Sequence, residues 1–156
     1  MRNLRSILFF ISLVLLAQTA FAQQDWRWDT HGVGFSAPAN LRVTTNNAEE
    51  FAAEGSDIAL SIQAMQDGEI TKEDLATALV AAATEMKYDN ISAASEVSID
   101  DFSGYFVDGT KDDVGALIVM LLDKKSATNL IIVIAYTTDE ARQKAIDVAD
   151  SFYAFD

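Results

Sequence analysis

Two strongly apolar stretches in the second half of the chain constrain its fold more than any other feature. The first covers residues 114–122 and the second covers residues 129–136, with a charged turn at residues 123–126 between them. Strands that are apolar at nearly every position are typical of sheets covered on both faces. We therefore expect these two stretches to form the centre of a sheet that has further layers packed on it.

The remaining segments predict shorter strands and two helices. Residues 57–65 alternate apolar with small or polar side chains, which is the period of a half-buried strand. A helix is predicted to begin after Thr71 as N-cap, and a second helix after Thr137, with Glu140 completing a capping box. The order of strands, helix, strands and helix predicts an α+β domain in which two main helices pack on a mostly antiparallel sheet.

The first helix has one clear apolar stripe, formed by Leu75, Leu79, Ala82 and Met86. Ile132 lies inside the second apolar stretch, where no polar residue interrupts residues 130–134. We expect Leu79 and Ile132 to be buried in the same layer between helix and sheet.

Several segments together resemble a known family over nearly the whole region after residue 22. They are GVGFSAPANLRV (32–43), the helix at 71–87, VSIDDFSGYFVDGT (97–110) and NLIIVIAYTTDEARQKAIDVADSFY (129–153). In this arrangement the chain resembles the Mog1/PsbP-like α/β/α sandwich family, as a bacterial exported member. The resemblance implies a module that binds or stabilises a partner, and it assigns no functional residue, because the family has no shared motif to match.

The N-terminal residues have the three zones of a secretory signal peptide. Arg2 and Arg5 precede an apolar run at residues 7–17, and the small-residue triplet at residues 20–22 follows. The apolar run is shorter than the roughly 20 residues that a membrane-spanning helix needs. We therefore expect residues 1–22 to be a cleaved signal peptide, residues 23–156 to be a single domain, and the protein to be periplasmic or secreted, without stable membrane insertion after cleavage.

Charge and cysteine content narrow the class of protein further. Removing residues 1–22 takes away two of the 11 basic residues and none of the 24 acidic ones, so the formal net charge changes from −13 to −15. Such a charge repels nucleic acid and anionic surfaces, so we expect no nucleic-acid partner. The chain contains no cysteine, so its stability depends on an apolar core without disulfides.

No catalytic pattern is present in the sequence. The single histidine, His31, has no nucleophile or orienting carboxylate placed beside it by a known motif. We interpret it as an exposed or edge-strand residue, and we predict no catalytic residue and no cofactor.

Two acidic clusters are candidate ligands for a metal ion. Asp100 and Asp101 flank a predicted hairpin on one side and the three aspartates among residues 108–113 flank it on the other, so their carboxylates could converge on calcium. The spacing does not match the calcium-loop pattern, and Lys111 interrupts the second cluster. Solvated turns are the better interpretation, and we predict no metal site.

Aromatic residues offer a candidate contact surface for a ligand or partner. Trp26 and Trp28 alternate with Arg27, which places both indoles on one face if this segment is extended, and Phe102 and Tyr105 lie on either side of Gly104. The alternative is that the tryptophans close the end of the core.

The leading hypothesis is an exported, non-enzymatic binding or accessory module that acts in the cell envelope on a protein or small ligand. The alternative is a small hydrolase that uses carboxylates in a pocket. A pocket with two or more converging carboxylates, or one lined by His31, would favour the hydrolase.

Overall fold

The computed structural model describes residues 22–65, 70–125 and 128–156. The predicted signal peptide lies outside these residues except for Ala22. Across the described residues no helix is both long enough and apolar enough to cross a membrane.

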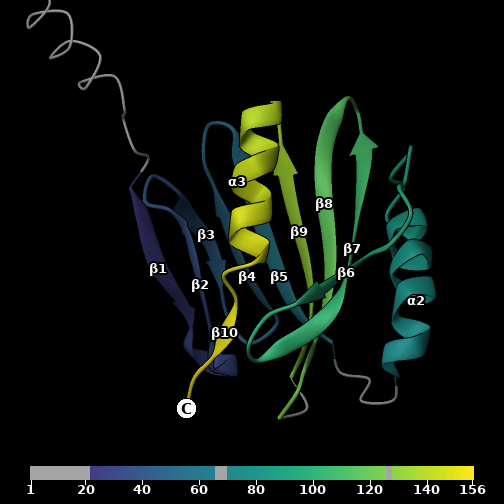
Figure 1. The fold of residues 1–156 in the computed structure, drawn as a ribbon. Helices are drawn as coiled ribbons and strands as arrows, with labels where there is room; N and C mark the ends of the chain where they lie inside the picture. The colour runs from purple at the N-terminus through teal and green to yellow at the C-terminus, as the bar shows by residue number, and fades with distance from the viewer. Residues whose placement is uncertain (1–21, 66–69, 126–127) are drawn as a thin grey trace, which may run out of the picture.

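A seven-stranded sheet forms the middle of the molecule (Figure 1), and every neighbouring pair of strands is antiparallel. This confirms the predicted sheet. In spatial order its strands are β3 (Arg42–Asn46), β4 (Glu50–Glu54), β5 (Ile58–Met65), β9 (Asn129–Tyr136), β8 (Val114–Asp123), β7 (Phe102–Lys111) and β6 (Ser95–Ser98). The two apolar stretches are therefore the central strand β9 and its neighbour β8, as expected.

A second, smaller sheet joins the two ends of the described chain. Its strand order is β1 (Gln23–Trp28), β2 (Val33–Pro38) and β10 (Tyr153–Ala154), and the short 3-10 helix η1 (Asp29–His31) connects β1 to β2. Both neighbours pair with β2 in antiparallel register. Residues more than a hundred positions apart in the sequence therefore lie side by side in this sheet.

Two helices cover opposite faces of the large sheet. Helix α3 (Asp139–Ala149) packs with β2 on one face, and helix α2 (Lys72–Glu85) packs on β7 and β8 from the other. Figure 1 shows α3 over the central strands and α2 beside β7. This three-layer arrangement is the predicted α/β/α sandwich.

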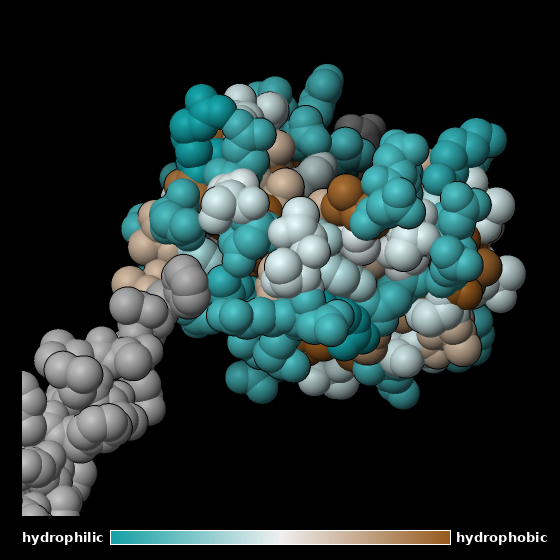
Figure 2. All heavy atoms as spheres, turned by 90° about the horizontal axis from the view of Figure 1, so that it is seen from above, coloured by the Kyte–Doolittle hydropathy of each residue, from teal (hydrophilic) through white to brown (hydrophobic). Residues whose placement is uncertain are grey.

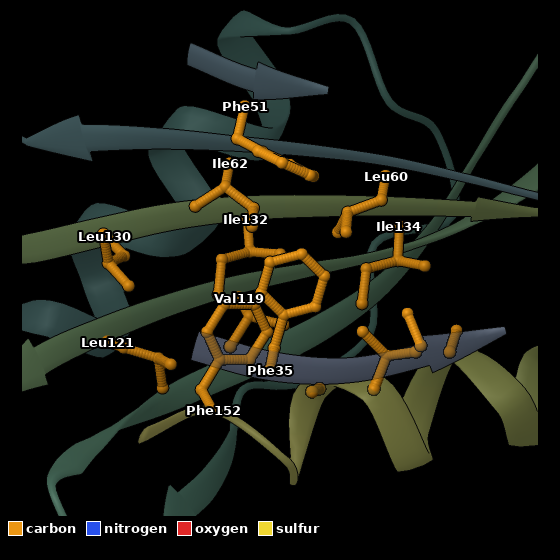
Figure 3. Packing of buried hydrophobic residues seen from close by; sticks show 14 of the residues in the cluster. Phe35, Phe51, Leu60, Ile62, Val119, Leu121, Leu130, Ile132, Ile134 and Phe152 are labelled. Atoms are coloured by element: carbon orange, nitrogen blue, oxygen red, sulfur yellow. The ribbon is translucent and has the colours of Figure 1, made fainter. Parts of the chain in front are cut away.

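The larger half of the core lies on the α3 face. Strand side chains such as Ile62, Ile132 and Val119 meet Phe35 from β2 and Phe152 from the segment after α3, as Figure 3 shows. The rings of Phe35 and Phe152 are stacked with centroids 5.1 Å apart. The small sheet is held to the large one by this aromatic packing.

The expectation that Leu79 and Ile132 share a layer is wrong. Both side chains are completely buried, but Leu79 lies in the cluster under α2 and Ile132 in the cluster under α3. Neighbouring residues of a strand face opposite sides of the sheet. In β9 it is therefore Ile131 and Val133, not Ile132, that border the cluster of Leu79.

The helix starts show one confirmed cap and one that is shifted. Thr71 caps α2 and accepts a hydrogen bond from the Asp74 amide, as predicted. Helix α3 is capped by Thr138, whose side chain accepts from the Ala141 amide at 3.1 Å, and not by Thr137. The Thr137 amide instead donates to the Asp57 carbonyl, which ties the end of β9 to the start of β5.

Candidate functional site

The predicted aromatic surface needs correction at two of its four positions. Trp28 and Phe102 are completely buried in the core under α3. The Trp28 indole nitrogen donates to the Asn47 carbonyl at 2.7 Å, so its polar atom is also satisfied inside the fold. Both side chains are part of the core, because burying a large aromatic ring stabilises the fold, and neither ring is available to contact a partner.

The other two aromatic residues do not form a common platform. Trp26 is half-buried against the core on the α3 face, and Tyr105 is half-buried against the core on the α2 face. The indole nitrogen of Trp26 is itself buried and has no hydrogen-bond partner. Among the described residues, no other buried side-chain nitrogen or oxygen lacks a partner. That Trp26 and Tyr105 contact a ligand or partner remains a prediction, and the two would do so on opposite faces of the sheet.

A pocket of about 310 Å³ lies where the small sheet meets the open ends of β7 and β8. Four of its lining residues are charged, namely three aspartates and a lysine, and they come from three segments. The lining consists of His31, Gly32, Asp101, Asp123, Lys125, Ala154, Phe155 and Asp156. The pocket therefore brings together residues from both ends of the described chain.

Gly32 explains why the C-terminal segment can form one wall of this pocket. Gly32 ends η1 in the left-handed region, with φ of +61°, and its carbonyl accepts a hydrogen bond from the Phe155 amide at 2.8 Å. A Cβ atom at this position would lie 2.5 Å from the Phe155 carbonyl oxygen. Glycine is therefore required both for the backbone conformation and for the close approach of the two segments.

Both carboxylate oxygens of Asp101 have partners. One of its oxygens accepts from the Ala154 amide at 3.0 Å, and the other lies 3.3 Å from the Lys125 ammonium. The hydrogen bond from Ala154, followed by that from Lys125, holds the pKa of Asp101 below its ordinary value. Asp101 therefore carries a stable negative charge at neutral pH.

His31 and Asp123 are also positioned by local hydrogen bonds. The Nε2 atom of His31 lies 2.7 Å from the Ala48 carbonyl oxygen, and the ring packs 4.2 Å from that of Trp28 between centroids. Asp123 accepts from the Lys125 backbone amide at 2.7 Å, which closes the turn after β8. Three of the pocket's polar side chains therefore have hydrogen-bond partners within the protein.

The lining can bind a cationic or hydrogen-bond-donating group. No serine, threonine or tyrosine is among the pocket's lining residues, so a hydroxyl nucleophile is absent from that lining. No group of three or more acidic or histidine side chains in the described residues has the geometry of a metal site. Three aspartates against one lysine leave the pocket acidic, which attracts positive charge.

The second acidic cluster does not form the calcium arrangement. Asp108 faces α3, where it accepts two hydrogen bonds from the Arg142 guanidinium at 2.9 and 2.7 Å and one from the Tyr136 hydroxyl at 3.0 Å. Burial alone would raise the pKa of Asp108, but the hydrogen bonds from Arg142 and Tyr136 outweigh it and lower that pKa. This ion pair fastens α3 to the sheet.

Part of the pocket has a signal in the sequence that pattern reading missed. In the antiparallel register Phe102 pairs with Asp123, so the residue before β7 and the residue at the end of β8 lie close together. In an antiparallel pairing of residues 102–111 with residues 114–123, the aspartates at the open end come together as a carboxylate pair. The contribution of His31 and the C-terminal segment has no such signal, because it depends on the pairing of β10 with β2.

Comparison with known proteins identifies the fold and no closer relationship. No protein-family model matches the sequence, and no curated protein matches it. Among solved structures, the chain is similar to the Ran-binding protein Mog1p of Saccharomyces cerevisiae, with a TM-score of 0.57 and 10% sequence identity. The match covers 88% of this chain and 97% of Mog1p. The chain therefore has a Mog1-like α+β fold.

Proposed function

We propose that this protein is an exported, non-enzymatic binding or accessory module of the cell envelope, periplasmic or secreted, and that the 310 Å³ pocket holds its ligand or part of its partner. The basic, apolar and small-residue zones of residues 1–22 support export. The fold supports a binding role only in a general way, since Mog1p is a Ran-binding protein.

One observation carries the proposal of binding rather than catalysis, namely the state of Asp101. A general acid or base works best when its pKa lies near the working pH. The pKa of Asp101 is lowered instead, and both of its oxygens already have partners in the Ala154 amide and the Lys125 ammonium. A carboxylate held in this way attracts a cation or a donor group but transfers protons poorly.

A small carboxylate hydrolase is the second candidate function, because the pocket meets both conditions set for it by the sequence. Asp101, Asp123 and Asp156 line one pocket, and His31 lines the same pocket. In such an enzyme His31 would be the candidate base and the carboxylates would orient it or the substrate.

Binding by the pocket can be tested by capture of partners from envelope extract. The parent protein should retain a defined set of molecules that Asp101→Asn loses, because the substitution removes one negative charge of the pocket without changing the size of the side chain. Asp100→Asn, at the neighbouring exposed position, is the matched control and should capture the same set as the parent. Equal capture by all three proteins would contradict the proposal.

The two candidate functions are separated by a direct activity measurement. Purified parent protein should not hydrolyse chromogenic esters, phosphates or glycosides above the rate in buffer. Turnover that is lost in both Asp101→Asn and His31→Ala would establish the hydrolase and exclude the binding module.

The export step has its own test. The exported protein should begin at Gln23, because Ala20 and Ala22 are small residues of the kind that signal peptidases accept. Intact-mass measurement of the exported material decides this, and retention of Met1 would show that the segment is not cleaved.

A further inference from the structure

Part of the large sheet is left open on the face that carries α2. On this face α2 packs on β7 and β8, whereas β9, β5 and β4 continue beyond it. The residues of these strands that face away from α3 are half-buried or exposed, unlike their neighbours on the α3 face. They include Ala52, Ala59, Ser61, Ile131, Val133 and Ala135.

A row of three alanines crosses this face near one end of the sheet. Ala135 of β9 is paired with Ala59 of β5 on one side and with Ala116 of β8 on the other. Because these side chains are short, the surface is hollowed here into two adjoining pockets of about 220 and 150 Å³. Both pockets are lined by Val114 and Ala135, so they form one trough, which we call the alanine trough.

The trough exposes apolar surface in a strongly acidic molecule. Val114 at its rim is 37% exposed, which makes it one of the most exposed large apolar side chains of the described residues. Figure 2, which views the molecule from the top of Figure 1, shows small hydrophobic areas set among mostly hydrophilic side chains. Apolar hollows with a polar rim are typical of sites where a partner docks.

The charges around the trough indicate the chemistry of that partner. Asp112 lines one hollow and Asp113 is exposed beside it in the turn between β7 and β8. Lys111 lines the same hollow as Asp112 and donates to the Met86 carbonyl at 2.9 Å, which leaves its positive charge in place, whereas Lys144 pairs with Asp57 at 2.7 Å. Asp112 and Asp113 together exceed Lys111 by one formal negative charge, so the rim presents a small excess of negative charge to an incoming molecule.

We propose that the alanine trough is a docking site for a segment of a partner protein that carries apolar side chains flanked by lysine or arginine. The apolar side chains would fill the two hollows, and the basic residues would lie beside Asp112 and Asp113. A second copy of this chain fits poorly, since two domains with formal charges of −15 each repel one another. This site is separate from the pocket of the proposed function and shares no lining residue with it.

A fluorescein-labelled amphipathic Leu/Lys peptide is a suitable probe, with its Leu/Glu counterpart as the charge-reversed control. Fluorescence anisotropy at physiological salt should show binding of the Leu/Lys peptide only. Ala135→Glu and Val114→Glu should each weaken that binding by about tenfold, because a carboxylate would be buried without a partner in an apolar contact. Both variants add negative charge, so attraction by charge alone would make them bind more tightly.

Three controls show whether the peptide binds in the trough itself. Gln24→Glu adds the same charge at an exposed position of β1 and should leave the affinity within about twofold of the parent. Asp101→Asn should also bind the peptide normally, because the pocket of the proposed function is elsewhere. Val114 is exposed, so Val114→Glu tests the trough in a folded protein even if Ala135→Glu lowers stability.

The proposal is overturned if no Leu/Lys peptide binds, if both trough variants bind as tightly as the parent, or if Asp101→Asn abolishes binding. It is also overturned if the protein ignores the peptide and binds phosphatidylcholine vesicles through Val114 instead. Weaker binding of both trough variants together with unchanged binding of Gln24→Glu and Asp101→Asn supports it, whatever the outcome for the pocket.

Discussion

Replacing Leu79 by alanine should destabilise the protein by an amount that the packing of α2 determines. The Leu79 side chain is completely buried between α2 and the sheet, so its removal leaves a cavity as well as a loss of apolar burial. Leucine-to-alanine changes in protein cores cost about 2–5 kcal/mol. The α2 layer is bordered by half-buried residues such as Ala82 and Ile131, which can move into the space, so we expect about 2–3 kcal/mol, in the lower part of that range.

A double-mutant cycle with Ile132→Val tests the placement of the two residues on opposite faces. The single change at Ile132 should cost about 0.5–1.5 kcal/mol, which leaves the double variant folded. Leu79 and Ile132 belong to separate clusters. Their effects on the free energy of unfolding should therefore add to within about 0.5 kcal/mol.

Urea titration of the parent, the two single variants and the double variant measures these free energies, provided that the dependence on urea concentration stays the same. A coupling energy above about 1 kcal/mol would mean that the two residues contact each other or share a cavity. A Leu79→Ala protein as stable as the parent would show that α2 does not bury this face. Either result would refute the arrangement of the two layers.

Three further predictions concern acid stability, sheet packing and metal binding. The pKa of Asp108 is lowered in the folded protein from an ordinary value of 3.8, so the stabilisation that its charge provides is present above that value and is lost as the pH falls through the folded pKa. Asp108→Asn should therefore flatten the acid end of a profile of unfolding free energy against pH, measured by urea titration. An unchanged profile would contradict the role of the ion pair between Asp108 and Arg142. Gly104→Ala should lower the free energy of unfolding by about 1–3 kcal/mol or more, because the added Cβ would overlap the Met120 carbonyl oxygen. Ser95→Ala, at an exposed position of the edge strand, should change it by less than about 0.5 kcal/mol. Equal urea midpoints for the two variants would show that the strands can separate freely at Gly104. Calcium should leave the melting temperature unchanged in a thermal scan, and a saturable rise would reveal a metal site that the described acidic residues do not show.

The pocket at the end of β7 and β8 shows where reasoning from the sequence stops. Asp101 and Asp123 lie at the open end of the hairpin of β7 and β8, and their proximity follows from its antiparallel register. His31 and Phe155 join them only because β10 pairs with β2. That pairing involves a strand of two residues, Tyr153 and Ala154, which has too few positions to carry a period that could be recognised in advance.

The amino-acid sequence by itself determined the kinds of element in this protein and which strands form the centre of its sheet. The apolar runs of β8 and β9, the alternation in β5 and the cap at Thr71 are local patterns, and local patterns specify strand and helix directly.

Only the tertiary structure decided which face of the sheet each helix covers, and with it the separation of Leu79 from Ile132. A strand that is apolar on both faces accepts a helix equally well on either one, so its sequence carries no preference between them. The choice depends on contacts between distant segments, such as the packing of Phe35 and Phe152 on the α3 face. The same choice leaves the alanine trough open on the other face, because α2 covers β7 and β8 but does not extend over β5 and β4.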